Sequence, residues 1–135
     1  ITYDYTLNFA KVFREINPDG TFIYVSGTGT RSSEKGGMMW QRVKGKTEND
    51  ILAMGFKQAF MFRPGFIRPL KGIESRTPSY RTAYKIMKPF WGIITTLMGK
   101  NLTDTTKIGK AMINVTFNGS EDNHFENPAI NALAQ

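Results

Sequence analysis

A five-residue run near the start of the chain, Thr-Phe-Ile-Tyr-Val at 21–25, constrains the fold most. It is β-branched and aromatic with almost no polar break, which is typical of a strand buried on both faces in a parallel sheet. The apolar run at 57–63 predicts a second strand, ended by Pro64 and Gly65. A helical pattern lies between the two runs. Strand, helix and strand in this order predict a right-handed βαβ unit with parallel strands.

Apolar residues spaced three and four apart predict the helices. The helix before the first strand has one apolar face, formed by Tyr5, Phe9, Val12, Phe13 and Ile16. The helix between the strands is predicted over about 38–54, with Gly55 ending it and an inner face of Met39, Trp40, Val43, Thr47 and Ile51. Residues 67–135 are predicted to be mainly helical, with helices near 79–87, 90–98, 104–115 and 126–133. Thr103 or Asp104 is the expected cap of the third of these.

Composition narrows the function classes. The 135 residues suit one domain, and the net charge of +7 favours an anionic partner such as a phosphate-bearing cofactor, nucleic acid or a lipid surface. A chain with no Cys has no disulfide, Cys-based zinc site or thiol nucleophile. Its one His, His124, has acidic neighbours but no second His or Cys nearby, so we expect no metal site. The chain contains no run of about 18 apolar residues, so no membrane span is predicted.

Three elements bring polar residues toward one edge of the predicted sheet. Ser26 follows the first strand, Trp40 and Lys44 lie one helical turn apart, and Arg63 ends the second strand. The carboxyl ends of strands are where open α/β sheets bind ligands. Taken singly, each residue also has an ordinary interpretation: Ser26 as a turn residue, Lys44 as a solvated charge, and Arg63 as an ion-pair partner or a phosphate ligand.

Three motifs in this order resemble the second half of a short-chain dehydrogenase/reductase, closest to the atypical epimerase/dehydratase-like members. They are Tyr-Val-Ser-Gly-Thr-Gly at 24–29, Met-Trp-Gln-Arg-Val-Lys-Gly-Lys-Thr-Glu at 39–48, and Phe-Arg-Pro-Gly-Phe-Ile-Arg-Pro at 62–69. The resemblance covers roughly residues 1–117. It implies an α/β fold with a partial Rossmann-like parallel sheet and flanking helices over 1–66. A mainly helical substrate-capping region over 67–135 completes the single domain.

The resemblance also implies roles for residues. Ser26 would hold a substrate oxygen, Lys44 would bond the nicotinamide ribose, and Pro64 and Gly65 would flank the nicotinamide. Trp40 stands where the family has its acid/base Tyr, and an indole N–H does not ionise near neutral pH, so this proton-transfer group is replaced. The candidate catalytic residues are therefore Ser26, Lys44 and Trp40. Further substrate-lining candidates are Thr28, Tyr80 and Tyr84.

One family motif is missing from the chain. No G-x-x-G-x-x-G turn follows a strand, so we expect NAD or NADP to bind the intact protein and not this chain alone. The chain is interpreted as starting before the family's fifth strand, which leaves the strand at 21–25 with an unpaired edge. We expect a second copy of the chain or an N-terminal segment to cover that edge. A homodimer is also what the resemblance implies.

The favoured function is an NAD(P)-dependent oxidoreductase or epimerase acting on a small molecule. The rival is a non-catalytic binding or sensor protein that retains the scaffold. A third alternative is a basic nucleic-acid-binding domain, which we do not favour because no nucleic-acid motif accompanies the charge. The sequence from Ile1 onward shows no signal peptide, and we expect a cytoplasmic protein.

Overall fold

A computed structural model describes residues 2–68, 86, 88–90, 92–93, 96 and 99–135. Its main helices are α1 (Thr2–Ile16), α2 (Met39–Ala53), α5 (Thr105–Asn118) and α6 (Asn127–Leu133). Its strands are β1 (Thr21–Val25), β2 (Gln58–Arg63), β3 (Phe66–Arg68), β4 (Leu102–Asp104) and β5 (His124–Glu126). Two 3-10 turns are η1 (Lys88–Phe90) and η2 (Gly99–Asn101).

The strands form a parallel sheet in the order β1-β2-β5 and a separate parallel pair, β3-β4. In the larger sheet, Tyr24 lies beside Met61, and Met61 lies beside His124. The α/β class and the parallel βαβ unit β1-α2-β2 are therefore confirmed. The Rossmann-like assignment stays a prediction.

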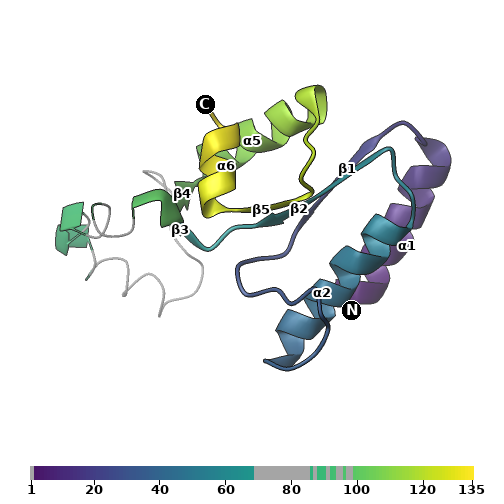
Figure 1. The fold of residues 1–135 in the computed structure, drawn as a ribbon, viewed down its shortest axis with the longest axis horizontal. Helices are drawn as coiled ribbons and strands as arrows, with labels where there is room; N and C mark the ends of the chain where they lie inside the picture. Colours follow the sequence, from purple (N-terminus) through teal and green to yellow (C-terminus); the bar gives the residue numbers. More distant parts are fainter. Residues whose placement is uncertain (1, 69–85, 87, 91, 94–95, 97–98) are drawn as a thin grey trace.

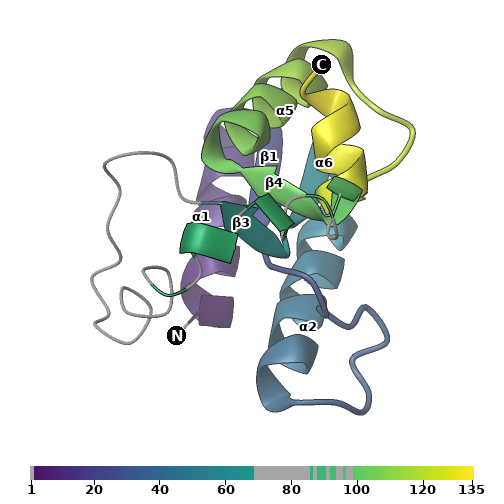
Figure 2. The ribbon, with the colours of Figure 1, turned by 90° about the vertical axis from the view of Figure 1, so that its left-hand side faces the viewer.

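Helices cover both faces of the β1-β2-β5 sheet (Figure 1). On the face toward α1 and α2, the core contains Leu7, Ala10, Phe22, Tyr24, Ile51 and Met61. On the face toward α5 and α6, it contains Phe60, Phe62, Ala111, Val115, Phe125 and Ile130. Alternation along β2 places Met61 on the first face and its two Phe neighbours on the second, as a pleated strand requires. Helices α5 and α6 lie side by side, and both contact β4 (Figure 2).

Helix α2 has the predicted bounds but a different buried face. It ends at Ala53, and Gly55, two residues later, has a φ of +72°, a backbone conformation that favours glycine. Its buried residues are Gly45, Thr47, Glu48 and Ile51. Met39, Trp40 and Val43 are exposed, so the predicted inner face is wrong at these three positions. Gly45 explains why α2 is turned about its axis relative to the prediction. At Gly45 the helix approaches the chain at Arg31 so closely that a side chain would not fit.

Helix α1 forms as predicted, but most of its apolar stripe faces outward. Only Leu7 and Ala10 are buried, while Phe13 is half-buried. The exposed members of the stripe are Tyr5, Phe9, Val12 and Ile16, with exposed fractions of 52–79%.

The first turn of α1 is held to α2 by polar contacts. The Tyr3 hydroxyl donates to the Asp50 carboxylate at 2.5 Å, and Lys46 Nζ donates to the same oxygen at 2.9 Å. The bond to Asp50 raises the pKa of Tyr3, and the bonds from Tyr3 and Lys46 lower the pKa of Asp50. The two helices are thus joined at one end by a hydrogen-bonded cluster.

The second half of the chain has more strand than predicted. Strands β3, β4 and β5 are three residues each, and none was expected from the sequence. Helices α5 and α6 confirm two of the four predicted helices, and Asp104 caps α5 by accepting from Lys107 N at 3.0 Å. The helices predicted near 79–87 and 90–98 lie largely outside the described residues.

Within the described ranges, β1 pairs with β2 alone. What covers the other edge of β1, whether a second copy or an N-terminal segment, stays a prediction. No helix in these ranges is long and apolar enough to cross a membrane.

Candidate functional site

The structure brings three of the predicted segments together at the carboxyl ends of β1 and β2. Lys44, from α2, donates through Nζ to the carbonyl oxygen of Ser26. Thr28 binds the turn after β2 twice: its N–H donates to Pro64 O at 3.1 Å and its hydroxyl donates to Arg63 O at 3.0 Å. The segments around 26, 44 and 64 therefore form one continuous set of contacts.

Lys44 and Trp40 lie one helical turn apart on α2 and contact each other. The Lys44 ammonium is 5.7 Å from the centre of the Trp40 ring, a cation–π distance. Trp40 is 39% exposed and Lys44 is half-buried. Gly27 lies beside Lys44 with a φ of +137°, and a Cβ placed there would be 3.9 Å from Lys44 Nζ. A cation, an aromatic face and an open stretch of backbone are thus side by side.

Ser26 is buried, and its hydroxyl proton points into the protein. Oγ donates to Glu48 Oε1 at 2.5 Å, with a longer approach of 3.4 Å to Phe62 O. A hydroxyl has one proton to donate, so in this arrangement Ser26 offers a ligand only its lone pairs. The predicted role of holding a substrate oxygen requires that proton to turn away from Glu48.

Glu48 and Arg63 form a buried ion pair, with side-chain exposures of 0% and 13%. Arg63 Nε lies 3.0 and 3.2 Å from the two carboxylate oxygens, and Nη2 donates to the carboxylate as well. Nη2 also donates to Ser32 Oγ at 2.6 Å, in the loop before α2. Of the two interpretations of Arg63 from the sequence, the described contacts are those of an ion-pair partner.

His124, on β5, approaches the same carboxylate. Its Nε2 is 3.6 Å from Glu48 Oε2 and, among the described residues, has no hydrogen-bond partner. Burial and the charge of Arg63 lower the pKa of His124, while Glu48 acts in the opposite direction. The neutral imidazole is therefore favoured, and Arg63 supplies the charge that balances Glu48.

Asn127 fixes the turn at Pro64 and Gly65. The Gly65 N–H donates to Asn127 Oδ1 at 3.0 Å, and Asn127 Nδ2 donates to Phe66 O at 3.1 Å and to Asn101 O at 2.5 Å. A Cβ at Gly65 would lie 2.8 Å from the Thr28 hydroxyl oxygen. The turn thus needs glycine for its close contact with the loop after β1.

Glu48, His124 and Asn127 were missed from the sequence as members of this site. For Glu48 a signal existed: it follows Lys44 by four residues and so shares its helical face. His124 and Asn127 gave no such signal, because β5 was not expected. Tyr80 and Tyr84 lie outside the described residues, and their substrate-lining role stays a prediction.

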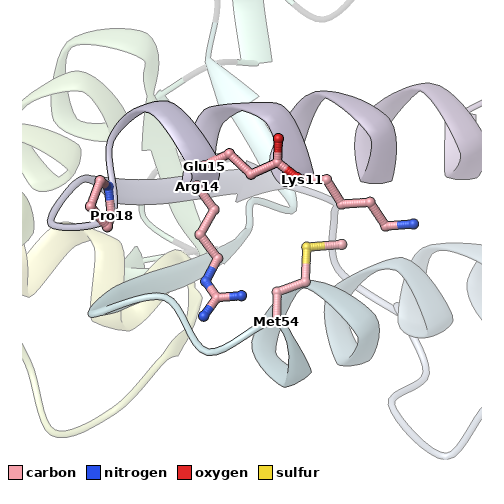
Figure 3. Close-up of a pocket in the computed structure, with 5 residues that line it drawn as sticks. All are labelled: Lys11, Arg14, Glu15, Pro18 and Met54. Carbon is pink, nitrogen blue, oxygen red and sulfur yellow. The ribbon is translucent and has the colours of Figure 1, made fainter.

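Two hollows among the described residues lie elsewhere. One, of about 340 Å³, lies between the ends of α1 and α2 and is lined by Lys11, Arg14, Glu15, Pro18 and Met54 (Figure 3). Met54 is ten residues after Lys44, about 15 Å along a helix. A smaller one, of about 210 Å³, is lined by Arg68, Gly99, Leu102, Thr103, Asp104 and Lys107. The candidate site around Lys44 lies at neither of these hollows and is defined by its contacts.

Comparison with known proteins gives two distant relatives. No protein-family model matches the sequence. The chain is 26% identical over 114 residues to "Protein fmp52, mitochondrial" of Emericella nidulans, which covers 84% of this chain and 47% of the relative. It is 28% identical over 84 residues to the protein of the same name from Aspergillus niger, covering 62% and 33%. The chain thus spans about half or less of the length of these curated relatives.

Both relatives are named as mitochondrial proteins. This finding overturns the expectation of a cytoplasmic protein. The expectation depended only on finding no secretory signal, which does not distinguish the cytoplasm from a mitochondrion.

Proposed function

We propose that this chain forms the ribose and substrate side of a nicotinamide-dependent oxidoreductase or epimerase of the short-chain type. The observation that supports this most is the position of Lys44, whose ammonium is bound to the Ser26 carbonyl at the carboxyl end of β1 and faces the loop that contacts Pro64. An ammonium has three N–H donors, and the bond to Ser26 uses one. The others are available to ribose hydroxyls.

The residues around Lys44 fit such a group. Gly27 has no side chain beside the ammonium, and its φ excludes most other residues, so backbone and cation remain accessible together. Pro64 and Gly65 would flank the nicotinamide, with Thr28, Tyr80 and Tyr84 on the substrate side. When bound, the nicotinamide would supply the hydride acceptor or donor. This chain's part is to hold the ribose and orient the ring.

Dinucleotide binding tests the proposal. The protein expressed from its complete coding sequence is titrated calorimetrically with NADH and with NADPH, as wild type, Lys44→Ala and Lys57→Ala. Lys57 is a matched control because it is exposed and paired with Asp19. We expect Lys44→Ala to weaken binding about tenfold, the effect of losing charge-assisted hydrogen bonds, and Lys57→Ala to leave it unchanged. Equal affinities in all three proteins would contradict the proposal.

A second candidate is binding without turnover. Two features favour it: by the resemblance, Trp40 stands where the family has its Tyr, and the Ser26 proton is donated to Glu48. Neither group, as placed, delivers a proton to a carbonyl oxygen. Oxidation of bound NADH or NADPH by any member of a panel of aldehydes and ketones supports the enzyme. Tight binding with no oxidation supports the sensor.

We further propose a mitochondrial location, supported by the names of the two matched relatives. Fractionation of cells that express the complete protein with a C-terminal tag is the test. Recovery with mitochondria is expected, and recovery in the cytosolic fraction alone contradicts it.

A further inference from the structure

Two residues of α2 bind Ser26 at two different atoms. Lys44 donates to its carbonyl oxygen, and Glu48, one turn later on the same helical face, accepts from its hydroxyl at 2.5 Å. Ser26 is also bound through its N–H, which donates to Phe62 O at 2.9 Å. Every polar group of Ser26 is therefore in use, and the peptide between Ser26 and Gly27 has a fixed orientation.

The sheet explains why Glu48 reaches this position. Tyr24 and Met61 are neighbours on adjacent strands. Ser26 lies two residues after Tyr24, and Arg63 lies two residues after Met61. Alternation then directs both toward the α2 face. His124 lies beside Met61 on the next strand and has the same direction. Three strands thus present polar side chains to the one buried carboxylate of α2.

Arg63 fixes the carboxylate itself. A guanidinium that donates to both oxygens of a carboxylate sets its plane as well as its place. Arg63 meets this condition, because Nε donates to Oε1 at 3.0 Å and Nη2 donates to Oε2. The bond from Nη2 to Ser32 adds the loop before α2. The order of contacts runs from Arg63 to Glu48, then to the Ser26 hydroxyl, the Ser26 carbonyl and Lys44.

From this order of contacts we infer that Glu48 is the positioning residue of the site: by holding the Ser26 hydroxyl, it orients the carbonyl that places the Lys44 ammonium. Glu48 is fully buried, so it acts on the site through Ser26. The inference rests on the proposed function and names the group that positions Lys44 for it. The test of the inference uses no dinucleotide, so the inference and the proposed function can fail independently.

The test measures how accessible the Lys44 amine is. Limited acetylation of the chain, quantified for each lysine by mass spectrometry, compares wild type with Ser26→Ala, Ser26→Thr and Glu48→Gln. Lys57 is the internal reference because it precedes β2, at the end of that strand opposite to Arg63, and pairs with Asp19. Proteins are compared at a temperature at which all are folded by circular dichroism.

Ser26→Ala leaves the Glu48–Arg63 pair in place and removes only the hydroxyl. We expect it to raise acetylation of Lys44 relative to Lys57 roughly threefold to tenfold, the range that one lost hydrogen bond allows. Ser26→Thr keeps the hydroxyl and is expected to match the wild type. In Glu48→Gln the carboxamide oxygen is expected to turn to Arg63 and its NH₂ to Ser26, which reverses the hydroxyl bond and also raises the ratio.

Two results overturn the inference. One is an unchanged ratio in folded Ser26→Ala. The other is an equal rise at all lysines, since a merely structural role loosens the whole molecule. If Glu48→Gln does not fold, the Ser26 pair of variants still decides. Failure of dinucleotide binding in the complete protein, with the ratio raised as expected, overturns the proposed function and leaves the positioning role of Glu48 in place.

Discussion

At the scale of single residues, the buried pair of Arg63 and Glu48 dominates the site. Two opposite charges removed from water are stabilising only when both are present with good geometry, because either charge alone is left uncompensated. The carboxylate here has a second donor in Ser26 and a neutral neighbour in His124. Single and paired substitutions at 48 and 63 should therefore differ in their effects.

Arg63→Met is expected to lower the free energy of unfolding by about 3 kcal/mol, since Glu48 remains buried without its partner. The double variant Glu48→Leu with Arg63→Met should recover most of this loss, with about 1 kcal/mol remaining for the Ser26 proton that has lost its acceptor. Urea denaturation of the three proteins measures both values. A double variant that is less stable than Arg63→Met contradicts the account.

His124 predicts a specific pH dependence. Its pKa lies below the usual 6.5 because of burial and Arg63, so the unfolded chain binds a proton more readily than the folded one. The contribution of His124 to stability is therefore complete above the pKa that this residue has in the unfolded chain. It is lost as the pH is lowered through that pKa. Between about pH 7.5 and about pH 5.5, the melting temperature of the wild type should fall more than that of His124→Gln. Equal slopes would falsify this assignment, and the chain has no other His to confuse it.

Part of the site could be predicted at this scale. Ser26 and Lys44 were singled out by a strand end, by helical spacing and by the family resemblance of the motifs that contain them. Glu48 follows Lys44 by four residues, but a carboxylate on a helix is usually solvated. Its burial becomes favourable only through Arg63, which is distant in the sequence. An ion pair between residues far apart in the sequence, such as Glu48 and Arg63, cannot be predicted from local spacing.

At the scale of elements, the orientation of α2 about its own axis is set by the close approach of Gly45 to the backbone of Arg31. A Cβ at Gly45 would lie 1.8 Å from Arg31 O and 2.4 Å from Arg31 C, both backbone atoms that have little freedom to move. This contact explains why the polar side of α2, and not its Met39 and Val43 side, faces the protein. Helix patterns read from apolar residues alone miss such a steric constraint.

Gly45→Ala is expected to destabilise the protein by about 2 kcal/mol, although Ala is the better helix former by about 1 kcal/mol. Gly109→Ala in α5 is the matched control, because a Cβ there meets no described atom within 4 Å. It should stabilise the protein by about 0.5–1 kcal/mol. Urea denaturation of both variants gives the comparison, and the same sign of change in both would contradict the steric argument.

The outward stripe of α1 predicts self-association. Its four large apolar side chains lie three and four residues apart, and a second copy related by a twofold axis would bury them against their equivalents. We expect light scattering to give the mass of two chains for the wild type and of one chain for Phe9→Glu. Phe117→Glu, at an even more exposed aromatic on α5, should leave the mass unchanged. A wild-type monomer contradicts this prediction.

Element prediction from the sequence succeeded where the signal was long. The strand at 21–25, α2 and α5 each have their own composition or periodicity, and each formed with nearly the expected bounds. Strands β3, β4 and β5 are only three residues long and consist of ordinary residues such as His-Phe-Glu. They exist because a neighbouring strand supplies hydrogen bonds, which is a tertiary effect.

At the scale of the whole molecule, the sheet between two helical layers brings the ends of β1 and β2 to one edge, and α2 supplies that edge with Lys44, Trp40 and Glu48. The chain spans less than half the length of its matched relatives, so the complete protein is the appropriate sample for function. The central claim is that Lys44 binds the ribose of a nicotinamide dinucleotide.

The most direct measurement is a crystal structure of the complete protein with NADH or NADPH bound. The account predicts a ribose hydroxyl within about 2.7–3.2 Å of Lys44 Nζ, with Pro64 and Gly65 against the nicotinamide. A dinucleotide bound elsewhere, with Lys44 contacting only Ser26, would contradict it.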